Sequence, residues 1–315
     1  MKILSRPKKN AAEYGKWAVN PYLGCPNDCV YCYRNTGPGK KVIGGSVVRL
    51  KKDVVSNDHA YHLAMVEIIE HKDEIIRDGG LFFTFTSDPC LPTTCDLTFQ
   101  IAADAMNYGI PVTLLTKNAD FCGMGNPSVQ LFAVVCQVNS WLTHIVMFQN
   151  TYQERLAIGF TLTGRDDLEP LASSNQKRIN ALEYLNGEGW LTWASIEPVI
   201  DFDSSLRMIQ QALDAGCQHF KIGLMTEHTK VCRRGFTLGG KTFEPYDPAR
   251  CLAFVQDVMT ATRDRATVYW KQSFRDFIGG TGKHRLFTDD ELHKIFDDYP
   301  NAVGKDWSMF NPQNK

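Results

Sequence analysis

The sequence predicts an α/β protein built around a parallel sheet, and three observations lead to this fold class. Short apolar segments alternate with helical stretches, which is typical of βαβ units with right-handed crossovers. The strand segments are apolar at consecutive positions, which indicates burial on both faces, as in a barrel or a doubly wound sheet. The 315 residues are 43% hydrophobic and 22% charged, the composition of an ordinary globular protein.

Each predicted element has its own local signal. Six segments are short, rich in β-branched or aromatic residues and bounded by turn residues, and are predicted as strands: 81–86, 111–116, 157–162, 190–196, 219–224 and 267–270. We expect Glu197-Pro198 to end the fourth of these strands. Capping residues and glycines delimit the predicted helices: 97–108, 173–185, from Asp203 or Ser204 to Gly216, and 249–263.

The same pattern predicts the domain organisation. We expect a core domain at residues 18–271, an N-terminal arm at 1–17 and a C-terminal extension at 272–315. Two stretches fall outside the alternation. Residues 123–154 are predicted as mainly helical, and 288–291 form a capping box that starts one last helix.

Charge and hydropathy exclude several classes of protein. With 34 Lys+Arg against 35 Asp+Glu, the net charge of -1 gives no bulk electrostatic argument for nucleic acid, although Arg49–Lys52 and Lys230–Arg234 are local basic groups. No apolar run approaches the ~18 residues that a membrane span needs. The N-terminus is basic but lacks the apolar stretch of a signal peptide. We therefore expect a cytoplasmic protein without a membrane partner.

Three of the ten cysteines stand together. Cys25, Cys29 and Cys32 lie at positions i, i+4 and i+7 of a segment whose Pro, Gly, Asn and Asp favour a loop. Iron–sulfur clusters are commonly held by four cysteines, so three leave one iron open to a substrate or cofactor. Two alternatives remain at this point: a closed zinc site completed by a distant Cys or His, and a chance grouping. The other cysteines, apart from Cys90, show no compact ligand spacing and are expected to pack in the core.

This cysteine spacing, with Tyr31 before the last cysteine, resembles the signature of radical S-adenosylmethionine (SAM) enzymes. The resemblance implies a partial (β/α)6 barrel with a C-terminal extension and a [4Fe–4S] cluster on Cys25, Cys29 and Cys32. It also implies that SAM chelates the open iron and that an external one-electron reductant of the flavodoxin or ferredoxin type supplies the electron. Reductive cleavage of SAM then gives methionine and a 5′-deoxyadenosyl radical, which abstracts hydrogen from a substrate.

Within this superfamily the chain resembles the spore photoproduct lyase-like branch. The matching segments lie within residues 18–225: 20–25, 31–33, 86–89 and 115–117. The substrate is unidentified, and the resemblance keeps nucleic acid as an alternative, in a repair or modification reaction. A non-catalytic iron–sulfur or zinc-binding protein is the alternative from another class.

Further site residues are expected where parallel strands end, at the carboxyl edge of the sheet. The resemblance implies that Ser87 and Asp88 replace the Gly-Gly-Glu motif that receives the SAM amino group. It implies that Lys117 pairs with the SAM carboxylate and that Tyr31 lies beside the adenine. The remaining candidates for cofactor binding follow strands or flank the cysteines: Tyr33, Thr161, Thr163, Arg165 and Glu197. Lys271, which follows the last predicted strand, is a further candidate.

Cys90 is a separate candidate. Spore photoproduct lyase uses a cysteine near this loop as a hydrogen donor to the product radical. The nearest matching position in this sequence is Thr86, and Cys90 comes four residues later. If Cys90 is the hydrogen donor, the donor stands four residues later in this sequence than in spore photoproduct lyase.

Overall fold

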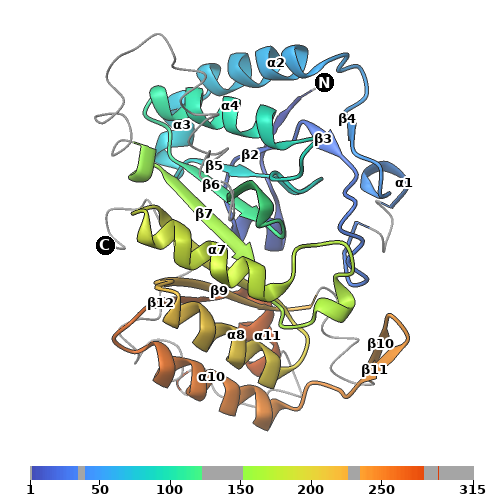
Figure 1. The fold of residues 1–315 in the computed structure, drawn as a ribbon, viewed down its shortest axis with the longest axis vertical. Helices are drawn as coiled ribbons and strands as arrows, with labels where there is room; N and C mark the ends of the chain where they lie inside the picture. Colours follow the sequence, from blue (N-terminus) through green and yellow to red (C-terminus); the bar gives the residue numbers. More distant parts are fainter. Residues whose placement is uncertain (1, 35–39, 123–151, 226–234, 280–289, 291–315) are drawn as a thin grey trace.

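A computed structural model describes residues 2–34, 40–122, 152–225, 235–279 and 290 (Figure 1). Its centre is an eight-stranded sheet in the order β1-β2-β5-β6-β7-β8-β9-β12. All pairings from β2 to β12 are parallel, whereas β1 at the edge is antiparallel to β2. The predicted α/β class with a largely parallel sheet is confirmed. Within the described ranges β1 and β12 do not pair with each other, so the sheet is open and no closed barrel is seen.

The six predicted strands are all present. They are β5 (Leu81–Phe83), β6 (Val112–Thr116), β7 (Leu156–Thr161), β8 (Leu191–Val199), β9 (His219–Leu224) and β12 (Thr267–Trp270). β5 is shorter than predicted: after Phe83 the chain forms hydrogen bonds with the Asn20 side chain and does not continue the strand. The Asn20 Oδ1 accepts hydrogen bonds from Thr84 Oγ1 (2.9 Å) and from the Phe85 backbone N–H (2.7 Å).

The predicted end of the fourth strand is wrong. β8 continues through Glu197 and Pro198 to Val199. Proline has no N–H to give to the neighbouring strand. The pairing of β8 with β9 shifts register between Ile196 and Val199, and this irregularity accommodates the proline. Glu197 therefore lies within the strand and not in the turn after it.

The N-terminal part of the chain contributes strands that the pattern did not predict. β1 (Leu4–Ser5) and β2 (Ala18–Val19) flank the short 3-10 helix η1 (Lys9–Glu13), and β1 pairs with β2. After β2 the chain forms the antiparallel pair β3 (Tyr22–Leu23) and β4 (Arg49–Leu50), with α1 (Lys40–Ile43) before β4.

Helices cover the outer face of the sheet (Figure 1). They are α2 (Asn57–Glu70), α3 (Lys72–Arg77), α4 (Cys95–Asn107), α7 (Asn175–Gly187), α8 (Phe202–Asp214), α10 (Pro248–Thr262) and α11 (Gln272–Gly279). The predicted helices correspond to α4, α7, α8 and α10. α8 starts earlier than predicted because Asp201 is its N-cap and accepts from the Ser204 backbone N–H. The short elements η2 (Asp120–Cys122), η3 (Asp166–Leu168) and the hairpin β10 (Phe236–Leu238) with β11 (Lys241–Phe243) complete the described fold.

The two faces of the sheet are packed differently. Alternate side chains such as Phe83, Leu114 and Ile158 join the large core under the helices. The inner face carries a small separate cluster of Ala18, Phe82, Ala157 and Trp193. Gly159 allows this packing, because a Cβ there would lie 2.1 Å from the Trp193 ring.

Some predictions fall outside the described residues. These are most of the predicted helix at 123–154, the basic group at 230–234 and, except for residue 290, the capping box at 288–291. Across the described ranges, none of the helices combines the length and the apolar character needed to cross a membrane.

Candidate functional site

The cysteine loop follows β2 and has a tightly fixed backbone. Gly24 has φ +84°, and a Cβ on it would lie 2.0 Å from the Val47 carbonyl oxygen, so glycine is required there. The Cys25 N–H donates to Gly45 O (3.0 Å), and the Cys32 N–H donates to Cys29 O (3.0 Å). None of the three cysteines of the loop takes part in a disulfide with another described residue.

Asp88 anchors the loop to the carboxyl edge of the sheet. Its carboxylate accepts from Asn27 Nδ2 (3.1 Å), from Thr116 Oγ1 (2.6 Å) and from the backbone N–H groups of Cys90 (3.0 Å) and Lys117 (2.9 Å). Both oxygens of this buried carboxylate thus accept two hydrogen bonds each. The loop is held where β2, β5 and β6 end. The predicted role of Asp88 as a SAM ligand stays a prediction, and the role that the structure describes is to fasten the loop.

The loop offers three thiols, the ligand type that iron–sulfur clusters use. Burial raises the pKa of Cys25 to about 11 and that of Cys29 to about 12, so binding of iron must displace thiol protons. In the ranges given above, no three His, Cys, Asp or Glu side chains meet closely enough to hold one metal ion. A cluster fits the donor set, because each thiolate binds its own iron.

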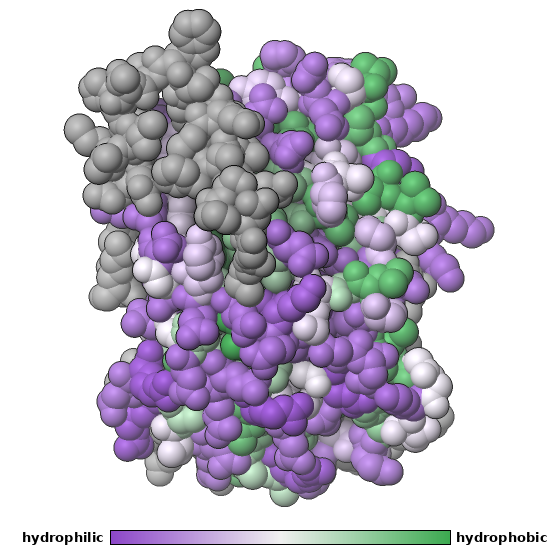
Figure 2. Space-filling view, in the orientation of Figure 1, coloured by the Kyte–Doolittle hydropathy of each residue, from purple (hydrophilic) through white to green (hydrophobic). Residues whose placement is uncertain are grey.

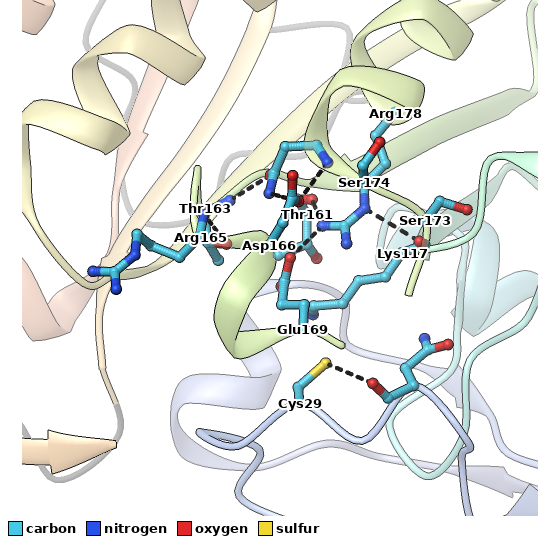
Figure 3. A network of polar contacts seen from close by, with 12 residues as sticks. Cys29, Lys117, Thr161, Thr163, Arg165, Asp166, Glu169, Ser173, Ser174 and Arg178 are labelled. Atoms are coloured by element: carbon cyan, nitrogen blue, oxygen red, sulfur yellow. Dashed lines mark hydrogen bonds and ion pairs between the residues drawn. The ribbon is translucent and has the colours of Figure 1, made fainter. Parts of the chain in front are cut away.

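A buried ion pair lies behind Cys29 (Figure 3). Arg178 Nη1 is 2.8 Å from Glu169 Oε2, and both side chains are fully buried. The Tyr31 hydroxyl donates to the other oxygen of Glu169. Arg178 also donates to Thr161 O (2.8 Å) and Lys117 O (3.2 Å), which joins the ends of β7 and β6.

Lys117 completes this group, which we call the Cys29 network: Cys29, Tyr31, Lys117, Glu169 and Arg178. In Figure 3 its side chain runs toward Glu169 and Cys29, and its Nζ is 5.6 Å from the centre of the Tyr31 ring. Burial lowers the pKa of Lys117, but the Cys29 thiol and the Glu169 carboxylate outweigh burial and raise it. The network therefore places a positive charge beside the Cys29 thiol.

The sequence did not single out Glu169 or Arg178. Glu169 follows η3 in a run of acidic residues, and Arg178 lies in a helix of mixed polarity. Their burial distinguishes them, and burial of single charged residues leaves no local pattern in a sequence.

Ser87 and Tyr33 also contact the loop region. Ser87 Oγ donates to Gly24 O (2.6 Å), and the Tyr33 hydroxyl donates to Phe85 O. Tyr33 is 46% exposed and lies at the surface beside the loop. The structure therefore brings Ser87, Asp88, Lys117 and both tyrosines to the cysteines, and their roles toward SAM stay predictions.

Cys90 donates its backbone N–H to Asp88 and is 3% exposed. Burial raises its pKa well above the usual value, with smaller contributions from Cys95, Asp88 and Cys122. A protonated, buried thiol is inert as a nucleophile, and its predicted role as a hydrogen donor stays a prediction.

The candidates at the end of β7 and just after it differ in burial and direction. Thr161 and Thr163 are buried, at 3% and 0% exposure. Arg165 points away from Cys29 (Figure 3) and pairs with Asp167 (2.8 Å) and Asp201 (3.2 Å). The structure thus does not bring the Arg165 side chain to the cysteines.

Glu197 belongs to a second buried group on the inner face of the sheet. It accepts from the Tyr14 hydroxyl and from Lys271 Nζ (2.7 Å). Lys271 also lies 3.7 Å from Glu13 Oε2. Lys221 Nζ donates to Glu13 O (2.8 Å), and burial lowers its pKa to about 7. We call these five residues the inner-face network.

Comparison with solved structures identifies the fold. A spore photoproduct lyase mutant with dinucleoside spore photoproduct superimposes with a TM-score of 0.54 at 14% sequence identity, covering 85% of this chain and 79% of that one. The chain has the fold of spore photoproduct lyase. A second structure, that enzyme complexed with dinucleoside spore photoproduct, gives 0.53 at 15% identity, with the same coverage of each chain.

Comparison of sequences does not assign the chain to a family. No family model matches the chain. An uncharacterized protein of Methanocaldococcus jannaschii is 26% identical over 192 residues, which cover 59% of this chain and 61% of that protein. The match therefore spans less than two thirds of the relative's own length.

Proposed function

We propose that this chain is a radical SAM enzyme that holds a [4Fe–4S] cluster on Cys25, Cys29 and Cys32. One observation carries the proposal: a loop with three cysteines, none of them in a disulfide with another described residue, is fastened to the carboxyl edge of a parallel sheet. The spacing of these cysteines resembles the radical SAM signature, and the fold is shared with spore photoproduct lyase. When bound, the cluster supplies one electron for cleavage of SAM.

The chain's own residues have distinct tasks in this proposal. Asp88 and Ser87 hold the loop in place through Asn27 and Gly24. Lys117 provides a cation at the carboxyl edge for the SAM carboxylate, and Tyr31 offers an aromatic face for adenine.

Reconstitution with iron and sulfide under anaerobic conditions tests this function. We expect about four iron atoms per chain, a cluster spectrum in electron paramagnetic resonance that shifts when SAM is added, and release of 5′-deoxyadenosine with dithionite. Substitution of Cys25, Cys29 and Cys32 by alanine should abolish all three. Cys251→Ala is the matched control, because Cys251 is a buried cysteine on α10, outside the site and not in a disulfide. Iron binding and SAM cleavage that survive in the triple variant would end the proposal, and a cluster that does not respond to SAM would favour a non-catalytic iron–sulfur protein.

Nucleic acid is the second candidate substrate, favoured by the fold shared with an enzyme solved with dinucleoside spore photoproduct. Binding of labelled DNA or RNA with steep salt dependence would support it. Absence of binding at low salt would exclude it.

A further inference from the structure

A basic stretch of chain borders the cysteine loop. Between Asp28 and Asp53 there is no acidic residue, whereas the whole chain has a net charge of -1. The same interval holds six basic residues: Arg34, Lys40, Lys41, Arg49, Lys51 and Lys52. We call the surface formed by residues 40–52 the basic surface. Positive charge is therefore concentrated in this segment, although the chain as a whole is nearly neutral.

The basic surface lies directly on the cysteine loop. β4 pairs with β3, and Gly45 O accepts the hydrogen bond from the Cys25 N–H at 3.0 Å. The buried Arg34 side chain donates to Gly45 O (3.2 Å) and Ile43 O (3.1 Å), which fixes the segment against the loop. A partner on this surface would therefore be separated from Cys25 by little more than one layer of backbone.

The surface also exposes apolar side chains. Val42 is 64% exposed and Val47 is 73% exposed, and Lys40 and Lys41 are exposed beside them. Figure 2 shows hydrophobic and hydrophilic residues interspersed along the edge where α1 and β4 lie. The two valines add apolar contact area to the positive charge that this surface offers a partner.

We propose, as an extension of the proposed function, that the basic surface docks an acidic one-electron carrier protein. The carrier is oxidised by one electron, and the cluster behind Cys25 is reduced by that electron. No atom is transferred, and no further reactant is needed. Opposite charges steer the encounter, and the valines contribute apolar contact once the two proteins meet.

Two observations favour a protein over nucleic acid as the partner. Arg49 donates to Val42 O (2.8 Å) and Gly44 O (3.3 Å), and Lys51 donates to Lys2 O (2.9 Å), so these cations are held by the chain's own backbone. Residues 40–52 also contain no aromatic side chain on which a base could stack.

Charge reversal tests the docking. Lys40→Glu/Lys41→Glu is compared with Arg207→Glu/Arg263→Glu, which makes the same change of charge at exposed positions on α8 and just after α10. Stopped-flow absorbance measures the second-order rate of cluster reduction by a reduced, acidic flavodoxin. We expect at least a ~10-fold lower rate for the Lys40/Lys41 variant at low salt, a smaller difference at high salt, and little change in the control.

Dithionite separates this proposal from the proposed function. With dithionite as a small reductant, the Lys40/Lys41 variant should cleave SAM as fast as the wild type. Equal flavodoxin rates for the two double variants would overturn the docking site while leaving the radical SAM function intact. A wild type that neither loads a cluster nor cleaves SAM with dithionite would overturn both.

Two further measurements keep the test decisive. Lys40→Gln/Lys41→Gln should show the same direction of change with a smaller size, and it replaces the charge reversal if that variant folds poorly. Fluorescence anisotropy with a labelled oligonucleotide tests nucleic acid as the alternative partner of the basic surface. Loss of oligonucleotide binding in the Lys40/Lys41 variant with an unchanged flavodoxin rate would assign the surface to nucleic acid and refute the proposal.

Discussion

The Cys29 network and the inner-face network are both buried and both contain paired charges, but they connect different parts of the chain. The Cys29 network joins the cysteine loop to η3, α7 and the ends of β6 and β7. The inner-face network joins the N-terminal segment to β8, β9 and the end of β12. The first holds residues beside the thiols, and the second holds the N-terminus across the sheet. Buried charged residues on one sheet can therefore position side chains beside the cysteines or attach the N-terminal segment, depending on which segment they contact.

The two networks also differ in burial. Arg178 and Glu169 have 0% side-chain exposure, whereas Lys271 and Glu197 have 2% and 19%. An unpaired charge costs more where water cannot reach it. Removal of one partner should therefore affect the two networks unequally.

The largest effect is expected for Arg178→Leu. This change leaves Glu169 buried and unpaired, and we expect the free energy of unfolding to fall by about 3–5 kcal/mol. Urea denaturation measures the loss. Iron content after reconstitution should fall with it, because the Lys117 carbonyl loses its donor and Glu169, which holds the Tyr31 hydroxyl, loses its charge partner. In Arg178→Leu/Glu169→Leu much of the stability should return, since no buried charge is left alone. A single variant as stable as the wild type would contradict the proposed importance of this pair.

A smaller effect is expected for Lys271→Met. Glu197 keeps the Tyr14 hydroxyl as a donor and is partly exposed, so we expect a loss of about 1–3 kcal/mol. The N-terminal segment should become more sensitive to limited proteolysis near residues 9–14. Iron content should stay at the wild-type level. A loss of iron as large as that in Arg178→Leu would show that the two networks are not separate.

The smallest effect concerns pH. Folding lowers the pKa of Lys221 to about 7, whereas an unfolded lysine titrates near about 10.4. Between these values the unfolded chain binds more protons, so the free energy of unfolding should rise with pH by up to about 1.4 kcal/mol per unit. Denaturation between pH 7.5 and about 9.5 measures this slope. Lys221→Met should flatten it, and the exposed Lys52→Met should not; identical slopes in all three proteins would refute the assignment.

The sequence predicted the parts of the fold that depend on local pattern. The six parallel strands and the helices α4, α7, α8 and α10 have apolar runs, caps and terminal glycines, which act over a few residues. The pattern did not predict β1 and β2, because two-residue strands have no periodicity. It also ended β8 too early at Pro198, because a register shift between two strands leaves no mark in one of them.

The site was predictable where residues are close in sequence. Cys25, Cys29 and Cys32 form one compact motif, and Ser87, Asp88 and Lys117 follow strands whose order was evident. Glu169 and Arg178 were missed, because their proximity to Cys29 depends on how η3 and α7 pack. Glu197 was expected to contact SAM or substrate, and this stays a prediction; its contacts with Tyr14 and Lys271 could not be predicted, because they join segments far apart in the sequence.

The contacts of the N-terminal segment have a consequence for biosynthesis. Asn10 accepts a hydrogen bond from Lys271, and these residues are 261 positions apart in the chain. On a ribosome the first of them emerges long before the second exists. Residues 9–14 can therefore reach their final place only after nearly all of the sheet has been translated. Contacts between such distant positions form slowly, so we expect the N-terminus to dock as one of the last events in folding.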